Sequence, residues 1–391
     1  MKTGFVLNGC FLLSALLLVT GCSNRLKSHG NKIETTEHKI SDKNKSAATV
    51  VSIVGEEFYI NGSPTFKGRT WKGYKIEGLL PNSRMVNGIF DDLNPASADL
   101  WKYPDTQKWD ADRNTKEFIE NMPIWNSYGL ACFNINLQGG SPQGYSNKQP
   151  WINSAYDENG ALRPAYMKRL KQILNKADEL GMVVNLGLFY FGQDENLKDE
   201  KAVLAAVDNI IDWLFTTNYK NILIEVANEC NNKAYNHPII QSDRIHELFD
   251  RIKRKQKNGY HFPISTSYNG GDLPAASIMQ QSDYVLLHGN GVSDPKKIAK
   301  MVESVRTMLG YAPKPILFNE DDHFDFDKEL NNFVAATSVH ASWGFFDYRK
   351  QGERFEEGYQ SVPVDWGIQS DRKKGFFNLL KTMTGKISAT K

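Results

Sequence analysis

The sequence predicts an α/β fold of the (β/α)8 or TIM barrel type, built as one domain with a long first βα loop. Short apolar runs alternate along the chain with longer amphipathic segments. Several runs are continuously apolar rather than alternating, as expected of parallel strands covered by helices. We count eight such runs, the number of strands in this type of barrel. A doubly wound open sheet is the structural alternative.

The expected strands are rich in branched and aromatic residues, which favour extended structure. In chain order, we expect them at residues 65–71, 130–137, 182–191, 222–229, 262–268, 283–290, 315–320 and 342–348. Residues 72–114, between the first two strands, are interpreted as the long first loop. Long loops without regular structure tend to carry function.

Amphipathic segments between the strands predict the helices. The segment at 163–181 has Pro164 near its start and Gly181 at its end, and its apolar residues recur every three to four positions. Further helices are expected at 202–217, 242–259, 294–310 and 371–383.

The N-terminal residues are expected to lie outside the barrel. An apolar stretch from Phe5 to Val19 has the length of a signal-peptide core and is short for a membrane span. It ends in "LLVTGC", with small residues directly before Cys22. This resembles a bacterial lipoprotein signal, which implies cleavage before Cys22, lipidation of its thiol and a membrane anchor. An ordinary cleaved secretory peptide is the alternative.

Residues 23–48 contain no aromatic residue and mix both charges, so they favour a flexible tether. We therefore divide the chain into a signal peptide at 1–21, a tether at 22–48 and a single barrel domain at 49–391. Of the remaining cysteines, Cys132 and Cys230 fall on non-adjacent strands, beyond the reach of a disulfide.

The overall charge excludes one class of partner. The 391 residues carry a formal net charge of +2, which gives no reason to expect nucleic acid. Aromatic residues make up 12% of the chain, with 8 Trp and 16 Tyr. Aromatic faces pack against the C–H faces of sugars, although they also fill large cores.

Polar residues gather where the expected strands end, which is where barrels of this type place their functional groups. The fourth strand ends in Asn228 and Glu229, the sixth in His288 and Asn290, and the seventh in Asn319 and Glu320. Glu225 and Glu229 would share an inward face because side chains alternate along a strand. Glu229 would then lie at the mouth, and Glu225 would belong to a buried hydrogen-bonded network below it.

The strand ends "IEVANE" and "PILFNE" resemble the fourth and seventh strands of clan-A glycoside hydrolases, family five in particular. The resemblance implies a retaining glycoside hydrolase with Glu229 as acid/base and Glu320 as nucleophile. Asn228 would hold the sugar hydroxyl next to the reacting carbon. The implied partner is a polysaccharide or oligosaccharide outside the cytoplasm, and no cofactor is expected.

The chemistry gives an independent reason for two carboxyl groups. Breaking a glycosidic bond needs a proton for the leaving oxygen and a nucleophile or base on the other side of the sugar ring. One carboxyl must therefore be neutral while the other is charged. A separation of about 5 Å would favour retention of configuration.

Five further residues are candidates for substrate binding, with a core role as the alternative for several. His288, at the end of the sixth strand, is a candidate subsite ligand or partner for Glu320. Trp343 lies on the eighth strand, where the clan often places a sugar-stacking ring. The remaining candidates are Asn136, Tyr190 and Tyr268. The second-strand arginine usual in family five is absent, and Arg69 or Arg84 are the cations that could replace it.

Two other functions remain open. A barrel that has lost catalysis would be a carbohydrate-binding lipoprotein. The acidic segment "NEDDHFDFD" at 319–327 suggests a lyase or a metal-dependent hydrolase. Its spacing lacks the glycine and terminal glutamate of an EF-hand loop, so we predict no metal and a solvated acidic loop for Asp325 and Asp327.

Overall fold

The computed structural model describes residues 49–145 and 148–386. These residues fall within one compact unit, Asn44–Lys391. The predicted signal peptide, the tether up to residue 48 and the lipidation site Cys22 lie outside the described residues. Within the described part of the chain, no helix is long and apolar enough to cross a membrane.

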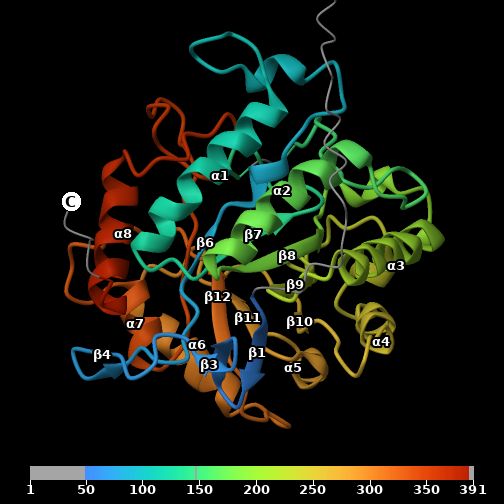
Figure 1. Ribbon diagram of the computed structural model, residues 1–391. Helices are drawn as coiled ribbons and strands as arrows, with labels where there is room; N and C mark the ends of the chain where they lie inside the picture. Colours follow the sequence, from blue (N-terminus) through green and yellow to red (C-terminus); the bar gives the residue numbers. More distant parts are fainter. Residues whose placement is uncertain (1–48, 146–147, 387–391) are drawn as a thin grey trace, which may run out of the picture. The chain divides into compact units, whose positions relative to one another are not determined.

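Eight parallel strands form the centre of the described unit (Figure 1), and they alternate with helices in the order of a (β/α)8 barrel. They are β6 (Asn82–Arg84), β7 (Cys132–Asn136), β8 (Val183–Phe189), β9 (Ile222–Ala227), β10 (Ile264–Ser265), β11 (Val285–His288), β12 (Ile316–Glu320) and β13 (Gly344–Phe345). The predicted fold class is therefore confirmed, and seven of the eight predicted strands coincide with barrel strands.

The strand ladders form two groups. One sheet has the order β10-β9-β8-β7-β6-β13, and β11 pairs with β12. A parallel bridge between Leu317 and Ser342 links β12 to the chain entering β13. Between β10 and β11 the ladder is interrupted, and the Asp283 amide donates to the Ile264 carbonyl at 2.9 Å instead.

Helices surround the strands (Figure 1) and follow them in chain order. They are α1 (Ala111–Ser127), α2 (Pro164–Leu180), α3 (Glu200–Thr217), α4 (His246–Arg254), α5 (Ala276–Gln281), α6 (Pro295–Arg306), α7 (Asn332–Ser338) and α8 (Asp371–Thr384). The α2 helix ends at Gly181, whose φ of +70° is the left-handed conformation that glycine adopts easily. On α3, the buried apolar residues from Val203 to Leu214 belong to the main hydrophobic core, and burial of each valine, isoleucine or leucine contributes roughly 1.5–3 kcal/mol.

The prediction of a first barrel strand at residues 65–71 is wrong. That segment ends in β4 (Thr70–Trp71), which pairs with β5 (Tyr74–Lys75) outside the barrel. The first barrel strand is β6, whose sequence Asn-Ser-Arg is polar and only three residues long. It has no apolar run to detect, and its position is held by pairing with β7 and β13.

The interpretation of 72–114 as one loop is also corrected. The 17-residue helix α1 begins within it, after the N-cap Asp110, whose side chain accepts from the Arg113 amide. Its first turns are polar and Pro123 lies inside it, which weakens the helical pattern. The first βα connection, 85–110, remains long and holds the 3-10 helices η1 (Val86–Ile89) and η2 (Ala98–Trp101). Two more, η3 (Asp194–Asn196) and η4 (Pro238–Ile240), follow β8 and β9.

An N-terminal antiparallel sheet covers the end of the barrel where the strands begin. It contains β1 (Val51–Val54), β2 (Glu57–Ile60) and β3 (Ser63–Pro64). Val51 and Phe58 are buried against residues at or near the strand starts: Leu80, Cys132, Val183, Leu223, Leu286 and Leu317, together with Tyr284. This end is filled with apolar side chains. Cys132 and Cys230 are buried free thiols, as predicted.

Candidate active site

Glu225 lies inside the barrel and is held by hydrogen bonds. Ser267 Oγ donates to its Oε1 at 2.6 Å, and Asn319 Nδ2 donates to its Oε2 at 2.9 Å. The residue is 1% exposed, and Arg84 Nη1 lies 4.0 Å from Oε2. The predicted buried network around Glu225 is confirmed, and this carboxylate has no open side for a ligand.

Glu229 lies in a turn two residues beyond the end of β9. Its φ of +53° is a left-handed conformation that few non-glycine residues adopt. The Glu229 amide donates to Ser267 Oγ at 2.9 Å, so the same serine contacts both glutamates. The turn, rather than strand alternation, therefore directs the Glu229 side chain to the barrel mouth. Such backbone strain costs roughly 1–3 kcal/mol and clusters at functional sites.

Glu320 is the last residue of β12, and its side chain is 7% exposed. Arg84 Nε lies 2.7 Å from its Oε2, and Asn290 Nδ2 donates to its Oε1 at 2.5 Å. Both oxygens of Glu320 therefore contact donor groups. Burial raises the pKa of Glu320 and the Glu229 carboxylate adds to this, whereas Arg84 and His288 act in the opposite direction.

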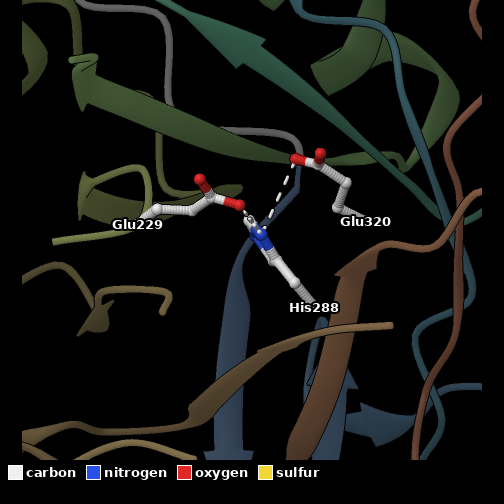
Figure 2. Close-up of side chains that lie close together, drawn as sticks. All are labelled: Glu229, His288 and Glu320. Atoms are coloured by element: carbon white, nitrogen blue, oxygen red, sulfur yellow. Dashed lines mark hydrogen bonds and ion pairs between the residues drawn. The ribbon is translucent and has the colours of Figure 1, made fainter. Parts of the chain in front are cut away.

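His288, at the end of β11, lies between the two carboxyl groups. Figure 2 shows its imidazole contacting both: Nδ1 is 3.1 Å from Glu229 Oε1 and 3.8 Å from Glu320 Oε2. Burial alone would lower the pKa of His288, but the negative charge of Glu320 and the hydrogen bond with Glu229 outweigh it and raise the pKa. The imidazole is thus stabilised in its charged form by its neighbours.

The two carboxyl groups approach each other closely. One carboxylate oxygen of Glu229, one of Glu320 and a ring nitrogen of His288 all lie within 4.8 Å of one another. These are ligand types that divalent metals accept. The guanidinium of Arg84, in contact with Glu320, would repel a cation at this position. The arrangement suits proton transfer by one carboxyl and nucleophilic attack by the other.

Arg84 organises the site from the first barrel strand. It is fully buried on β6, and its Nη2 donates to Asn228 Oδ1 at 2.7 Å. The sequence predicts that Arg84 lies in the long first loop. In the structure it lies on a barrel strand and contacts both Asn228 and Glu320. The other candidate cation, Arg69, is not in the site, because it donates to the Thr382 and Met383 carbonyls at the end of α8.

Trp343 does not present a ring to a ligand. It is fully buried, and its ring is stacked on Phe333 with centroids 5.0 Å apart. Its indole nitrogen donates to Asp321 Oδ2 at 2.8 Å, an oxygen that also accepts from Asn332. The prediction of a sugar-stacking role for Trp343 is contradicted, and the core alternative holds.

The remaining predicted residues differ in their positions. Tyr268 packs in the hydrophobic core beside the Cys230 thiol, is 7% exposed, and its hydroxyl has no partner among the described residues. Tyr190 borders the site, where it interacts electrostatically with Arg84 and Glu320, and its hydroxyl is 2.7 Å from Ser141 Oγ. Asn136 is 2% exposed, and neither of its amide atoms has a partner among the described residues. Asn136, Tyr190 and Tyr268 remain candidates.

Sequence reasoning did not assign Ser267 or Tyr145 to the site, and it named Asn290 at a strand end without giving it a role. Ser267 follows the short strand β10, and Asn290 follows β11 by two residues. Tyr145 comes from the connection between β7 and α2, where nothing in the sequence indicates a site. The signal for Asn290 was its position at the end of the sixth strand, two residues after His288.

Together, the fold and the site define a (β/α)8 barrel protein with two carboxyl groups and an imidazole clustered where its strands end. No protein-family model matches the sequence, and no curated protein matches it.

Comparison with solved structures agrees with the fold. A putative glycoside hydrolase from Bacteroides vulgatus has a TM-score of 0.53 at 12% identity, and the match covers 85% of this chain and 60% of that chain. An endo-1,4-β-mannanase from Rhizomucor miehei has a TM-score of 0.52 at 11% identity, covering 86% and 98%. A GH5-4 broad specificity endoglucanase from Clostridium longisporum has a TM-score of 0.51 at 11% identity, covering 78% and 97%. At such identities, the similarity establishes the fold alone.

Proposed function

We propose that the protein is a retaining glycoside hydrolase that cleaves O-glycosidic bonds in a polysaccharide or oligosaccharide. The observation that carries this proposal is the approach of Glu229 and Glu320, whose nearest carboxylate oxygens lie within 4.8 Å. Retaining enzymes place their two carboxyl groups about 5 Å apart, whereas inverting enzymes need roughly 6.5–9.5 Å to admit a water molecule. The observed spacing fits a double displacement.

In the first step, a Glu320 oxygen attacks the anomeric carbon while the bond to the leaving oxygen breaks. Glu229 gives its proton to that leaving oxygen. In the second step, Glu229 takes a proton from water, the water oxygen attacks the same carbon, and Glu320 leaves as a carboxylate. The cycle restores both groups and consumes one water molecule.

The surroundings of the two glutamates support different roles. Glu320 contacts the Arg84 guanidinium and the Asn290 amide, which stabilise the charged carboxylate that a nucleophile requires. Glu229 has His288 as its partner and the more exposed side chain, 14% against 7% for Glu320. This exposure gives Glu229 access to the leaving group and then to water.

Asn228 is proposed to bind the hydroxyl next to the reacting carbon. Arg84 donates to its side-chain oxygen, which fixes the amide and leaves the nitrogen available to donate. Hydrogen bonds to this hydroxyl strengthen in the transition state.

A glycan panel tests the proposal. Two similar structures are named as a mannanase and an endoglucanase, so β-1,4-mannan and β-1,4-glucan head the panel. NMR of the first products reports their anomeric configuration, and we expect it to match that of the substrate. Products with inverted configuration would contradict the proposed role of Glu320 as nucleophile. Binding without hydrolysis, equal in wild type and Glu320→Gln, would favour the carbohydrate-binding alternative.

We further propose that the protein is exported and anchored through a lipid on Cys22, so that it acts outside the cytoplasm. The support is the signal-like sequence before Cys22. Metabolic labelling with a radioactive fatty acid is expected to mark the wild type and not Cys22→Ala. Equal labelling of both would contradict the anchor.

A further inference from the structure

A chain of hydrogen bonds leads from Glu320 to the outer surface of the barrel mouth. The Asn290 amide nitrogen carries two protons and donates twice, to Glu320 Oε1 at 2.5 Å and to the Tyr145 hydroxyl at 2.6 Å. The Tyr145 hydroxyl donates to Asp322 Oδ2 at 3.0 Å. The other oxygen of Asp322 accepts from the Gly291 amide at 3.2 Å. Asp322 is therefore bonded to the same loop that carries Asn290.

The chemistry of these groups determines the direction of each bond. An ionised carboxylate only accepts, so the single hydroxyl proton of Tyr145 points to Asp322. The Tyr145 oxygen can then only accept, and it requires a donor from Asn290. An asparagine with its amide reversed would present oxygen to both Glu320 and Tyr145 and would lose both bonds. Tyr145 and Asp322 therefore select the amide orientation that donates to Glu320.

The groups in this chain come from separate βα connections. Tyr145 follows β7, Asn290 follows β11 and Asp322 follows β12. The Tyr145 ring packs edge-on against Phe346 and Tyr348, with centroids 5.6 and 5.0 Å away, yet the residue is 57% exposed. Through these contacts, Tyr145 joins the connection after the second barrel strand to the connections after the sixth, seventh and eighth strands.

We propose that Tyr145 and Asn290 are positioning residues for Glu320: Tyr145, held by Asp322, orients the Asn290 amide so that it donates to the nucleophile. The inference rests on the proposed function for the role of Glu320, but the hydrogen-bond chain itself does not. It also gives part of the acidic segment a role, since Asp322 holds Tyr145.

The charged environment of Glu320 gives the proposal a measurable signature. Burial raises the pKa of this carboxyl most, and Glu229 raises it further, whereas Arg84 from β6, His288 from β11 and the Asn290 hydrogen bond lower it. Tyr190, directly after β8, lies nearby, and burial raises its pKa, so its hydroxyl stays neutral near pH 7. Loss of the Asn290 bond removes one stabilising contact from the charged form, so the carboxyl should hold its proton to higher pH.

The first experiment needs no substrate. Protein labelled with 13C at the glutamate carboxyl is titrated by NMR, and Glu320→Gln identifies the Glu320 signal. We expect the titration midpoint to move to higher pH in Asn290→Ala and, by a smaller step, in Tyr145→Phe, which keeps the ring but removes the hydroxyl. Tyr348→Phe is the matched control, because it removes a hydroxyl from the same aromatic cluster outside the chain of bonds. Identical titration in wild type and Tyr145→Phe would overturn the proposal.

The second experiment measures hydrolysis by the same variants. Because the Tyr145→Phe ring can still pack as before, we expect kcat to fall roughly threefold while KM stays unchanged, and roughly tenfold in Asn290→Ala. A change confined to KM would mean that Tyr145 binds substrate instead, and this would contradict positioning. If wild type hydrolyses no glycan, the proposed function fails, while the titration still decides the hydrogen-bond chain.

Discussion

Arg84 Nε lies 2.7 Å from Glu320 Oε2, so the first and seventh strands of the barrel are joined by a buried ion pair. Both side chains are at least nine-tenths buried, and Arg84 also contacts Asn228 and approaches Glu225. Three polar groups of the site therefore depend on a single guanidinium. Removing one member of a buried pair leaves the other charge without compensation.

Replacing Arg84 should destabilise the protein and inactivate it. We expect Arg84→Met to lose roughly 3–5 kcal/mol of unfolding free energy, because the Glu225 and Glu320 charges would remain buried. Urea unfolding at pH 7 measures the change. The double variant Arg84→Met with Glu320→Gln should recover part of the loss, since one of those charges is then gone. A double variant that is less stable than Arg84→Met would contradict this account.

Glu229 and Glu320, the proposed acid/base and nucleophile, should respond differently to the leaving group. Glu229→Gln removes the proton donor, so the rate of hydrolysis of natural glycosides should fall by roughly 100-fold or more. The rate for aryl glycosides with acidic leaving groups should fall less, because these groups need no proton to leave. Glu320→Gln should reduce both substrate types alike, because the nucleophile is needed for either. Steady-state kinetics on matched substrate pairs tests this. If the hydrolysis rates of both variants depended equally on the leaving group, the proposed roles of Glu229 and Glu320 would be contradicted.

His288 should make the stability of the protein depend on pH. Its pKa is raised in the folded state by Glu320 and Glu229 despite burial, so its contribution is present below about pH 6.5 and lost as pH rises through the folded value. We expect the stability advantage of wild type over His288→Gln to be larger at pH 5.5 than at pH 9. Burial lowers the pKa of His340, so the comparison with His340→Gln should have the opposite sign.

Asp194 should destabilise the protein as it ionises. Burial raises the pKa of its carboxyl to about 6. The Asn236 and His237 amides donate to Oδ2, which acts in the opposite direction, whereas Oδ1 has no partner in the described part of the chain. The folded state therefore holds this proton more tightly, and stability falls between about pH 4 and pH 6. Relative to wild type, Asp194→Asn should gain up to roughly 3 kcal/mol between pH 4 and pH 7.

Urea unfolding at the two pH values measures the Asp194 effect. Asp194→Ala serves as the contrast, because it leaves the two amides without an acceptor and should be destabilising. A pH dependence equal in wild type and Asp194→Asn would contradict the assignment.

Trp343 should affect stability rather than substrate affinity. Trp343→Phe leaves Asp321 without the indole donor and opens a small cavity beside Phe333, so we expect a loss of roughly 2–4 kcal/mol. KM for the best glycan should not change. An increased KM with unchanged stability would restore the sugar-stacking interpretation.

Much of the barrel was predictable because its strands and helices bury long apolar surfaces, which leave a period in the sequence. The strands around Glu225 and Glu320 and the helix starting at Pro164 are of this kind. The polar strand β6 and the helix α1 were missed because pairing with neighbours and one capping aspartate determine them.

The sequence by itself determined the fold class and the two glutamates of the candidate site, since strand ends of parallel barrels meet at one mouth. Only the tertiary structure decided what each side chain contacts. It turned Glu229 inward through a left-handed turn, placed Arg84 against Glu320 and buried Trp343 in the core. The physical reason is that periodicity reports which face of an element is buried, whereas the partner of a polar group depends on elements far away in the chain.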